Sequence, residues 1–108
     1  MAPMGIFHLA APEQWAAARA CGSVAPESLA TEGFVHCSTD AQLAGTIQRH
    51  FGSVDALVLL RLHEAGLGAD LRWEESRPGE VFPHLYRAIR VDEVIEAIPW
   101  HRGAEDQP

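Results

Sequence analysis

Three histidines in this sequence lie within short runs of apolar, β-favouring residues, and they are the first candidates for chemistry. They are His8, His36 and His84. Imidazole titrates near neutral pH, so a histidine held in a cleft can bind a ligand or transfer a proton. A single histidine in such a run is more often an ordinary hydrogen-bonded side chain. Three in equivalent settings favour one shared site, because converging titratable groups are the usual mark of a site.

His36 is followed at once by a thiol and two hydroxyls, and this group opens a predicted helix. The residues from Thr39 to Gln42 have the S/T-x-x-E/Q form of a capping box, which marks a helix start. The first turn of a helix presents free backbone N–H groups and a partial positive charge. The junction after His36 is therefore a candidate place to hold an anion or a polar ligand.

Cys37 leaves two other chemistries open. Imidazoles and thiolates both bind zinc, but adjacent residues of a strand point to opposite faces, so His36 and Cys37 do not easily share one ion. The sequence has no H-x₃-H or C-x₂-C spacing, and no metal site is predicted. A thiol near a helix start can instead act as a nucleophile, with His36 or His84 as its base. A free cysteine more often only fills space in a core.

Three glutamates lie near the ends of predicted strands and are the candidate carboxylates. They are Glu32, Glu74 and Glu75. Glu74 follows Trp73 on a predicted strand, which could place its carboxylate at the rim of a cleft. Most carboxylates in such positions are solvated and take no part in chemistry.

The composition limits the class of protein. A chain of 108 residues with 47% hydrophobic residues fits one domain, expected over residues 1–102, with a flexible tail at 103–108. The net charge of −7 argues against an extended nucleic-acid surface, although one or two arginines could still form a phosphate pocket. Neither a membrane span nor a secretion signal is visible, and two cysteines suit a reducing compartment, so a cytoplasmic location is expected. Both a monomer and a homodimer remain open.

The elements that must position these residues follow from hydrophobic periodicity and turn signals. Helices are predicted over Pro12–Cys21, Pro26–Glu32 and from Thr39 to about Phe51. Strands are predicted over Gly5–Ala10, Phe34–Cys37, Ala56–Leu62, Asp70–Glu74, Phe82–Tyr86 and Ile95–Trp100. This order predicts an α+β fold with its helices concentrated in the first half.

Three packing predictions accompany these elements. The apolar run Ala56–Leu62 is expected to be a central strand buried on both faces. Pro83 cannot donate a ladder hydrogen bond, so its segment is expected to begin a strand or to lie on an edge. The core-facing stripe of the third helix is expected to consist of Ala44, Ile47 and Phe51.

Several strings of the sequence together resemble the bacterial domain-of-unknown-function family 952. The resemblance extends from about Gly5 to Trp100. Its strongest parts are Gly33-Phe34-Val35-His36-Cys37-Ser38 and Phe82-Pro83-His84-Leu85-Tyr86, with further matches at Ile6-Phe7-His8, Trp15, Ser28-Leu29, Gln42, Leu57–Leu62 and Trp73-Glu74.

That resemblance implies a fold like that of ADP-ribosyltransferases, in which split antiparallel β-sheets grip NAD in a cleft. It is nearest to enzymes with a histidine on each of two core strands, such as RNA 2′-phosphotransferases. It implies that His8 bonds hydroxyls of the ADP-ribose moiety and that His36 lies against the nicotinamide or its ribose. The resemblance also places three polar residues beside the pyrophosphate or ribose: Ser38, Thr39 and Gln42.

The predicted catalytic residues are His36, which the resemblance places at the nicotinamide end, together with His84 and Glu74, which are candidates from their own positions in the sequence. Breaking the nicotinamide–ribose bond builds positive charge on the sugar, and a carboxylate fixed nearby stabilises it. Glu74 is the candidate for that carboxylate. An alternative remains open in which the domain binds a ligand or a protein partner without catalysis, because a fold does not determine a function.

Overall fold

The apolar run expected to be a central strand forms β5 (Ala56–Leu62) in the computed structural model, which describes residues 5–103. It belongs to the largest sheet, whose strand order is β4-β1-β5-β9. The other members are β1 (Ile6–Ala10), β4 (Ser38–Thr39) and β9 (Val94–His101), and every neighbouring pair is antiparallel. The prediction of a central strand is confirmed.

Both faces of β5 pack against apolar side chains. Leu60 and Leu62 belong to the main core, whereas Leu57 belongs to a smaller cluster with Ile47 and Leu9. These assignments alternate along the strand, because successive side chains of a strand point to opposite faces.

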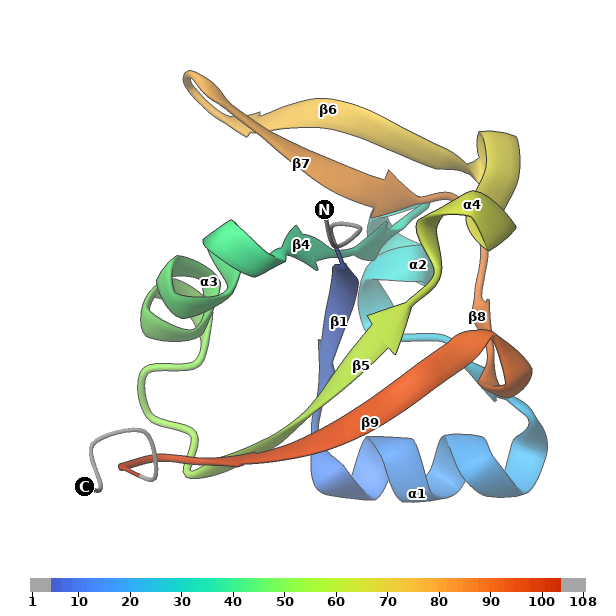
Figure 1. Ribbon diagram of the computed structural model, residues 1–108, viewed down its shortest axis with the longest axis vertical. Helices are drawn as coiled ribbons and strands as arrows, with labels where there is room; N and C mark the ends of the chain where they lie inside the picture. The colour runs from blue at the N-terminus through green and yellow to red at the C-terminus, as the bar shows by residue number, and fades with distance from the viewer. Residues whose placement is uncertain (1–4, 104–108) are drawn as a thin grey trace.

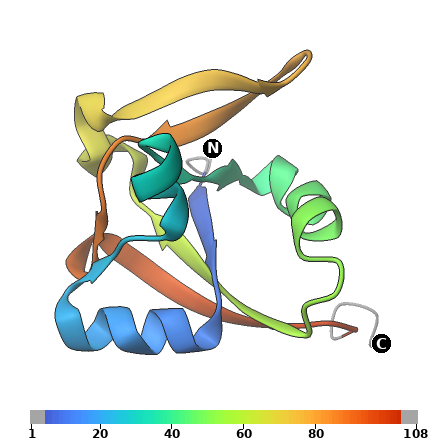
Figure 2. The same ribbon diagram turned by 180° about the vertical axis from the view of Figure 1, so that it is seen from behind.

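The remaining strands of the described residues form two smaller antiparallel sheets. One has the order β3-β7-β6, from β3 (Val35–His36), β7 (Glu80–Leu85) and β6 (Leu71–Arg77). The other pairs β2 (Ser23–Val24) with β8 (Ile89–Arg90). In Figure 1 the β6–β7 hairpin reaches past β4 toward α3 (Leu43–His50), and the reverse view in Figure 2 shows the same arrangement.

The helices are α1 (Pro12–Cys21), α2 (Glu27–Glu32), α3 and the short α4 (Glu64–Leu67), so three of the four described lie in the first half of the chain. The 3₁₀ turns are Asp40–Gln42, Gly68–Asp70 and Val91–Glu93. Both α1 and α2 end at a glycine in the left-handed region, Gly22 with φ 100° and Gly33 with φ 91°. Such a conformation favours glycine and stops a helix, and the two helices end at Cys21 and Glu32, as predicted. The coarse expectation of an α+β fold with helices mainly in the first half is confirmed.

The expected single strand Phe34–Cys37 is wrong in one respect that matters for the site. The chain instead leaves the β3-β7-β6 sheet after His36 and enters the largest sheet at Ser38, with Cys37 between them. The backbone N–H of Cys37 still donates to Pro83 O, at 3.1 Å, and then Ser38 pairs with Phe7 of β1. The two sheets are thus joined at this one residue.

The expected position of Pro83 is also wrong, because Pro83 lies within β7, the central strand of its sheet. In an antiparallel strand the N–H and C=O of one residue point to the same side. Since Pro83 O accepts the bond from Cys37, the missing donor of Pro83 faces the point where the two-residue β3 has already ended. The proline therefore removes one ladder donor at the very end of the β3–β7 pairing, and not within it.

The core stripe of α3 differs by one residue from the expected one. Ala44 is exposed, and Leu43 instead packs with Ile47 and Phe51 against the smaller cluster. The helix begins after a 3₁₀ turn, and this displaces the apolar stripe from the expected i, i+3 spacing to i, i+4. Among the described residues, no helix is long and apolar enough to cross a membrane. The tail predicted at 103–108 lies, beyond Gly103, outside the described residues.

Candidate functional site

A cavity of about 620 Å³ is lined by two of the three candidate histidines. Its lining residues come from β1, from the β3–β4 junction, from α3 and from the end of the β6–β7 hairpin. They include His8, His36, Cys37, Ser38, Thr46, Arg49, His50, Arg77 and Phe82. Its volume falls in the range of roughly 300–1,000 Å³ that is usual for small-molecule sites. We refer to this space as the His-lined cavity.

His8 is the most constrained group of this cavity, with 6% of its surface exposed. Its Nδ1 lies 2.8 Å from the carbonyl oxygen of His36, and because a carbonyl only accepts, Nδ1–H is the donor. Burial lowers the pKa of His8, the bond to the His36 carbonyl opposes that shift, and the His36 ring adds a smaller lowering effect. The neutral ring therefore keeps an unprotonated Nε2, which is buried and has no partner among the described residues.

His36 reaches the same cavity from β3, and its side chain is half exposed. Its Nε2 lies 3.1 Å from Oε2 of Glu32, one helical turn earlier in the chain. Glu32 also lines the cavity. Gly33 ends α2 between these two residues and turns the chain so that the carboxylate and the imidazole meet.

His84 lies directly opposite His36 in the β3–β7 pairing, with the two ring centroids 5.5 Å apart. It is only 4% exposed, because the Phe34 ring stacks on it at 4.1 Å. Its Nδ1–H donates to Oε1 of Glu74 at 2.8 Å, and Tyr86 Oη donates to the same oxygen at 2.6 Å. These two bonds, Tyr86 first, lower the pKa of Glu74, and the Glu74 carboxylate raises the pKa of Tyr86.

The three predicted catalytic residues thus belong to one contact network, but only His36 reaches the wall of the cavity. His84 and Glu74 do not line it. Nδ1 of His84 and Oε1 of Glu74 are already bonded to each other, whereas Nε2 of His84 has no partner among the described residues. The sequence did not show this network, because Glu74 and His84 are diagonal neighbours on the paired strands β6 and β7.

Ser38, Thr39 and Gln42 are placed differently from one another. Ser38 lines the cavity, and its Oγ lies 2.9 Å from Oγ1 of Thr46. The backbone N–H of Thr39 donates to Oε1 of Gln42 at 3.0 Å, as a capping box requires. The Gln42 amide then donates to Val81 O at 2.8 Å, so Gln42 attaches the 3₁₀ turn to the hairpin. Neither Thr39 nor Gln42 lines the His-lined cavity.

Two arginines line the cavity that no sequence motif identified. Arg49 lies in the last turn of α3 and has no ion-pair partner among the described residues. Arg77 is the last residue of β6, lies 3.3 Å from Glu80 and covers the Phe82 ring at 5.1 Å. In sequence, Arg49 and His50 resemble ordinary basic residues at a helix C-terminus, which the helix dipole favours. Only the fold brings Arg49 to the same cavity as Arg77, which lies 28 positions further along the chain.

The structure gives no support to the two alternative chemistries raised by Cys37. Burial raises the pKa of the Cys37 thiol to about 12, so hardly any thiolate exists at neutral pH. Within residues 5–103, no group of three or more His, Cys, Asp or Glu side chains is arranged to hold a metal ion.

Comparison with known proteins now places the chain. Residues 9–97 match the family described as "Protein of unknown function (DUF952)". The chain belongs to the DUF952 family. No curated protein matches it.

Solved structures of another bacterial protein share this DUF952 fold. The crystal structure of protein CC0527 from Caulobacter crescentus has a TM-score of 0.81 and 37% sequence identity, over 90% of this chain and 85% of that one. The solution NMR structure of CC0527 also has a TM-score of 0.81 and 37% identity, over 94% of this chain and 88% of that one. The similarity thus covers most of both chains.

Proposed function

We propose that this DUF952 domain binds an anionic nucleotide-type ligand, NAD or an ADP-ribosylated compound, in the His-lined cavity. The observation that carries the proposal is the Nε2 of His8, a buried acceptor on a residue that lines the cavity, with no partner among the described residues. An unpaired buried acceptor costs free energy, so it is commonly matched by a donor from water or a ligand. A ribose hydroxyl is a donor of the right kind.

The charge of the cavity supports the same class of ligand. The chain carries a net charge of −7, yet this cavity is lined by two guanidinium groups and one carboxylate, which His36 already engages. Arg77 is paired with Glu80, whereas Arg49 has no ion-pair partner among the described residues. Guanidinium groups bind phosphate oxygens with two parallel hydrogen bonds. Arg49 and Arg77 are therefore proposed to hold the phosphates, with Ser38 and His36 nearer the sugar.

The arrangement of the sheets is consistent with the expected ADP-ribosyltransferase-like architecture, which we include in the proposal. Two antiparallel sheets adjoin at Cys37, and His8 and His36 approach each other from one sheet each. A transferase of this kind would place the nicotinamide end of the ligand near His36. His84 and Glu74 would act through His36, since Phe34 covers His84.

A second candidate function, binding without transfer, is favoured by one observation. Glu74 Oε1 already accepts bonds from both Tyr86 and His84, so this oxygen is not free to face developing charge on a ribose. A domain that retains a nucleotide without cleaving it needs no such carboxylate.

Calorimetric titration with ADP-ribose, NAD and adenosine tests the proposal. We expect ADP-ribose and NAD to bind and adenosine, which lacks phosphates, to bind more weakly. Arg49→Gln should weaken binding of ADP-ribose roughly tenfold, as expected for one lost charge-assisted bond. The matched control is Arg19→Gln, which removes an exposed arginine of α1 that does not line the cavity. The absence of binding at millimolar ADP-ribose, or an equal loss in both variants, would contradict the proposal.

Incubation with NAD separates the two candidate functions. Release of nicotinamide, followed by chromatography, would indicate a transferase or hydrolase. Binding without release would indicate a nucleotide-binding module.

A further inference from the structure

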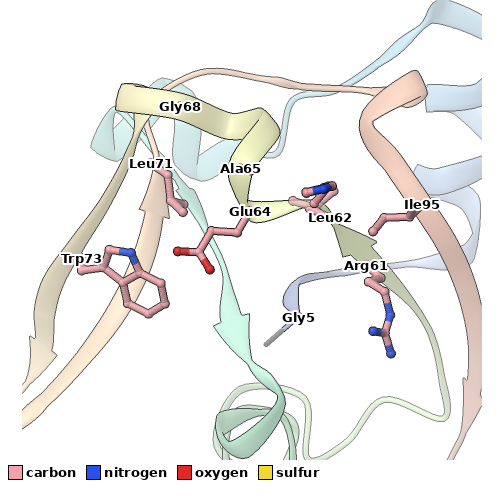
Figure 3. A pocket seen from close by; sticks show the side chains of 10 residues that line it. Gly5, Arg61, Leu62, Glu64, Ala65, Gly68, Leu71, Trp73 and Ile95 are labelled. Carbon is pink, nitrogen blue, oxygen red and sulfur yellow. The ribbon is translucent and has the colours of Figure 1, made fainter. Parts of the chain in front are cut away.

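A second cavity, of about 550 Å³, lies at the other end of β6 (Figure 3). Among the described residues, it shares no lining residue with the His-lined cavity. Its floor includes Leu62, which is buried, and Leu71, which packs on the main core. Trp73 and Ile95 form its apolar rim and remain 43% and 60% exposed.

The exposed indole of Trp73 is the first unusual feature of this second cavity. A tryptophan is large and apolar, and leaving its ring at the mouth of a hollow costs hydrophobic free energy that burial would recover. The face of an indole also attracts cations through its quadrupole, more strongly than the ring of tyrosine or phenylalanine. The position of Trp73 therefore suits a ligand that carries both an apolar part and a positive charge.

Glu64 supplies a negative charge to the same cavity. Its side chain extends from the first residue of α4 toward the Trp73 ring (Figure 3). Within the described residues, Glu64 makes neither a hydrogen bond nor an ion pair. Its carboxylate is thus free to pair with a cation that lies against the indole.

The one arginine that lines this cavity does not cancel that charge. Arg61 Nε lies 3.3 Å from Oε1 of Glu96 on the neighbouring strand β9, and its guanidinium covers the Phe7 ring at 5.1 Å. The charge of Arg61 is therefore balanced by Glu96. With Arg61 and Glu96 paired, the carboxylate of Glu64 is left as the uncompensated charge at the cavity.

The geometry points to a second binding site that takes a small organic cation on an apolar stem, an alkylguanidinium or alkylammonium compound. The stem lies against Leu71 and Ile95, and the charged head lies between the Trp73 ring and the Glu64 carboxylate. This site does not depend on the nucleotide proposed for the His-lined cavity.

The test is an NMR titration with n-butylguanidinium that follows the indole N–H signals. The chain has three tryptophans, and the variant Trp73→Phe identifies the signal of Trp73 by its absence. We expect n-butylguanidinium to shift that signal in a saturable manner and to leave the signals of Trp15 and Trp100 unchanged. The neutral isostere n-butylurea should bind several-fold more weakly.

Two pairs of variants distinguish this site from general attraction to an acidic protein. Glu64→Gln should weaken binding roughly two- to fivefold, the range expected for an exposed ion pair, whereas Glu13→Gln on α1 makes the same charge change far from the cavity and should not. Trp73→Leu and Trp73→Phe lack the indole that reports binding, so their affinities are measured by calorimetric titration with n-butylguanidinium. Trp73→Leu should weaken binding by a similar factor, and Trp73→Phe, which keeps an aromatic face, should retain most of it.

Three results would overturn the inference. One is no shift of the Trp73 signal at the highest soluble concentration of n-butylguanidinium. Another is equal binding of n-butylurea, which would mean that the charge plays no part. The third is an equal loss in Glu64→Gln and Glu13→Gln, which would mean that the cation follows only the net charge of −7.

Discussion

The two ring nitrogens of His8 have separate tasks in the proposed site, and one substitution separates them. Nδ1–H donates to His36 O at 2.8 Å, whereas the buried Nε2 has no partner among the described residues and is the acceptor proposed for a ligand. Asparagine places an amide N–H close to the position of Nδ1 but has no atom at the position of Nε2. His8→Asn should therefore keep the bond to His36 and lose the ligand acceptor, and His8→Ala should lose both.

The expected losses of stability and of affinity follow from the burial of the hydrogen bond between His8 and the His36 carbonyl. In His8→Ala the carbonyl of His36 loses its partner, and an unsatisfied buried acceptor costs about 1–3 kcal/mol of unfolding free energy. In His8→Asn that bond persists, so the loss should be less than about half as large and should come mainly from the missing ring atoms. Ligand binding should fall about two- to tenfold in both variants, since one neutral hydrogen bond contributes about 0.5–1.5 kcal/mol.

Urea unfolding measures the first quantity, and calorimetric titration with ADP-ribose measures the second. Stability and affinity should respond differently in His8→Asn. If His8→Asn binds ADP-ribose as the wild type does while His8→Ala does not, His8 has only a structural task. If His8→Asn is as unstable as His8→Ala, the bond to the His36 carbonyl does not carry the stability assigned to it.

Three further predictions concern pH, thiol reactivity and the partly buried ion pair of Arg87 and Glu93. Because burial lowers the pKa of native His8 below its usual 6.5, the unfolded chain binds a proton first, and stability should fall as pH drops below 6.5, by up to about 1.4 kcal/mol per pH unit from this residue. Urea unfolding at a series of pH values should show that this pH-dependent part of the stability is absent in His8→Asn. Iodoacetamide at neutral pH should modify exposed Cys21 and not Cys37, whose buried thiol has a pKa of about 12; mass spectrometry that finds folded Cys37 alkylated would refute this. Glu93→Gln should lower the unfolding free energy by about 1.5–3 kcal/mol, because Glu93 accepts two bonds from the Arg87 guanidinium at 2.8 Å each, and a thermal melt unchanged from wild type would contradict it.

The candidate site could be predicted in part from the sequence. His8 and His36 were identified from their residue type and their β-like surroundings, and Ser38 from its place at a predicted helix start and from the family resemblance; all three line one cavity. The pyrophosphate contacts expected of Thr39 and Gln42 stay predictions, and the structure shows these residues bonded to each other and to the hairpin. Arg49 was missed because its place in the chain is that of an ordinary helix-terminal arginine.

Local signals in the sequence determined the features that involve residues a few positions apart. The capping pair of Thr39 and Gln42, the glycine that ends α1 and the buried strand β5 all depend on backbone geometry within one turn or one strand. The residues that interact in such features are close together in the sequence, so periodicity and turn chemistry predict them.

Tertiary structure alone decided which segments became neighbours. It ended the strand expected over Phe34–Cys37 at His36 and took the chain into a second sheet at Ser38, placed Pro83 in a central strand and sealed His84 beneath Phe34. It also brought Arg49 and Arg77 to the wall that holds His8. These outcomes depend on strand order and register, which are set by pairing between distant segments and by the packing of whole faces rather than by any local run of residues.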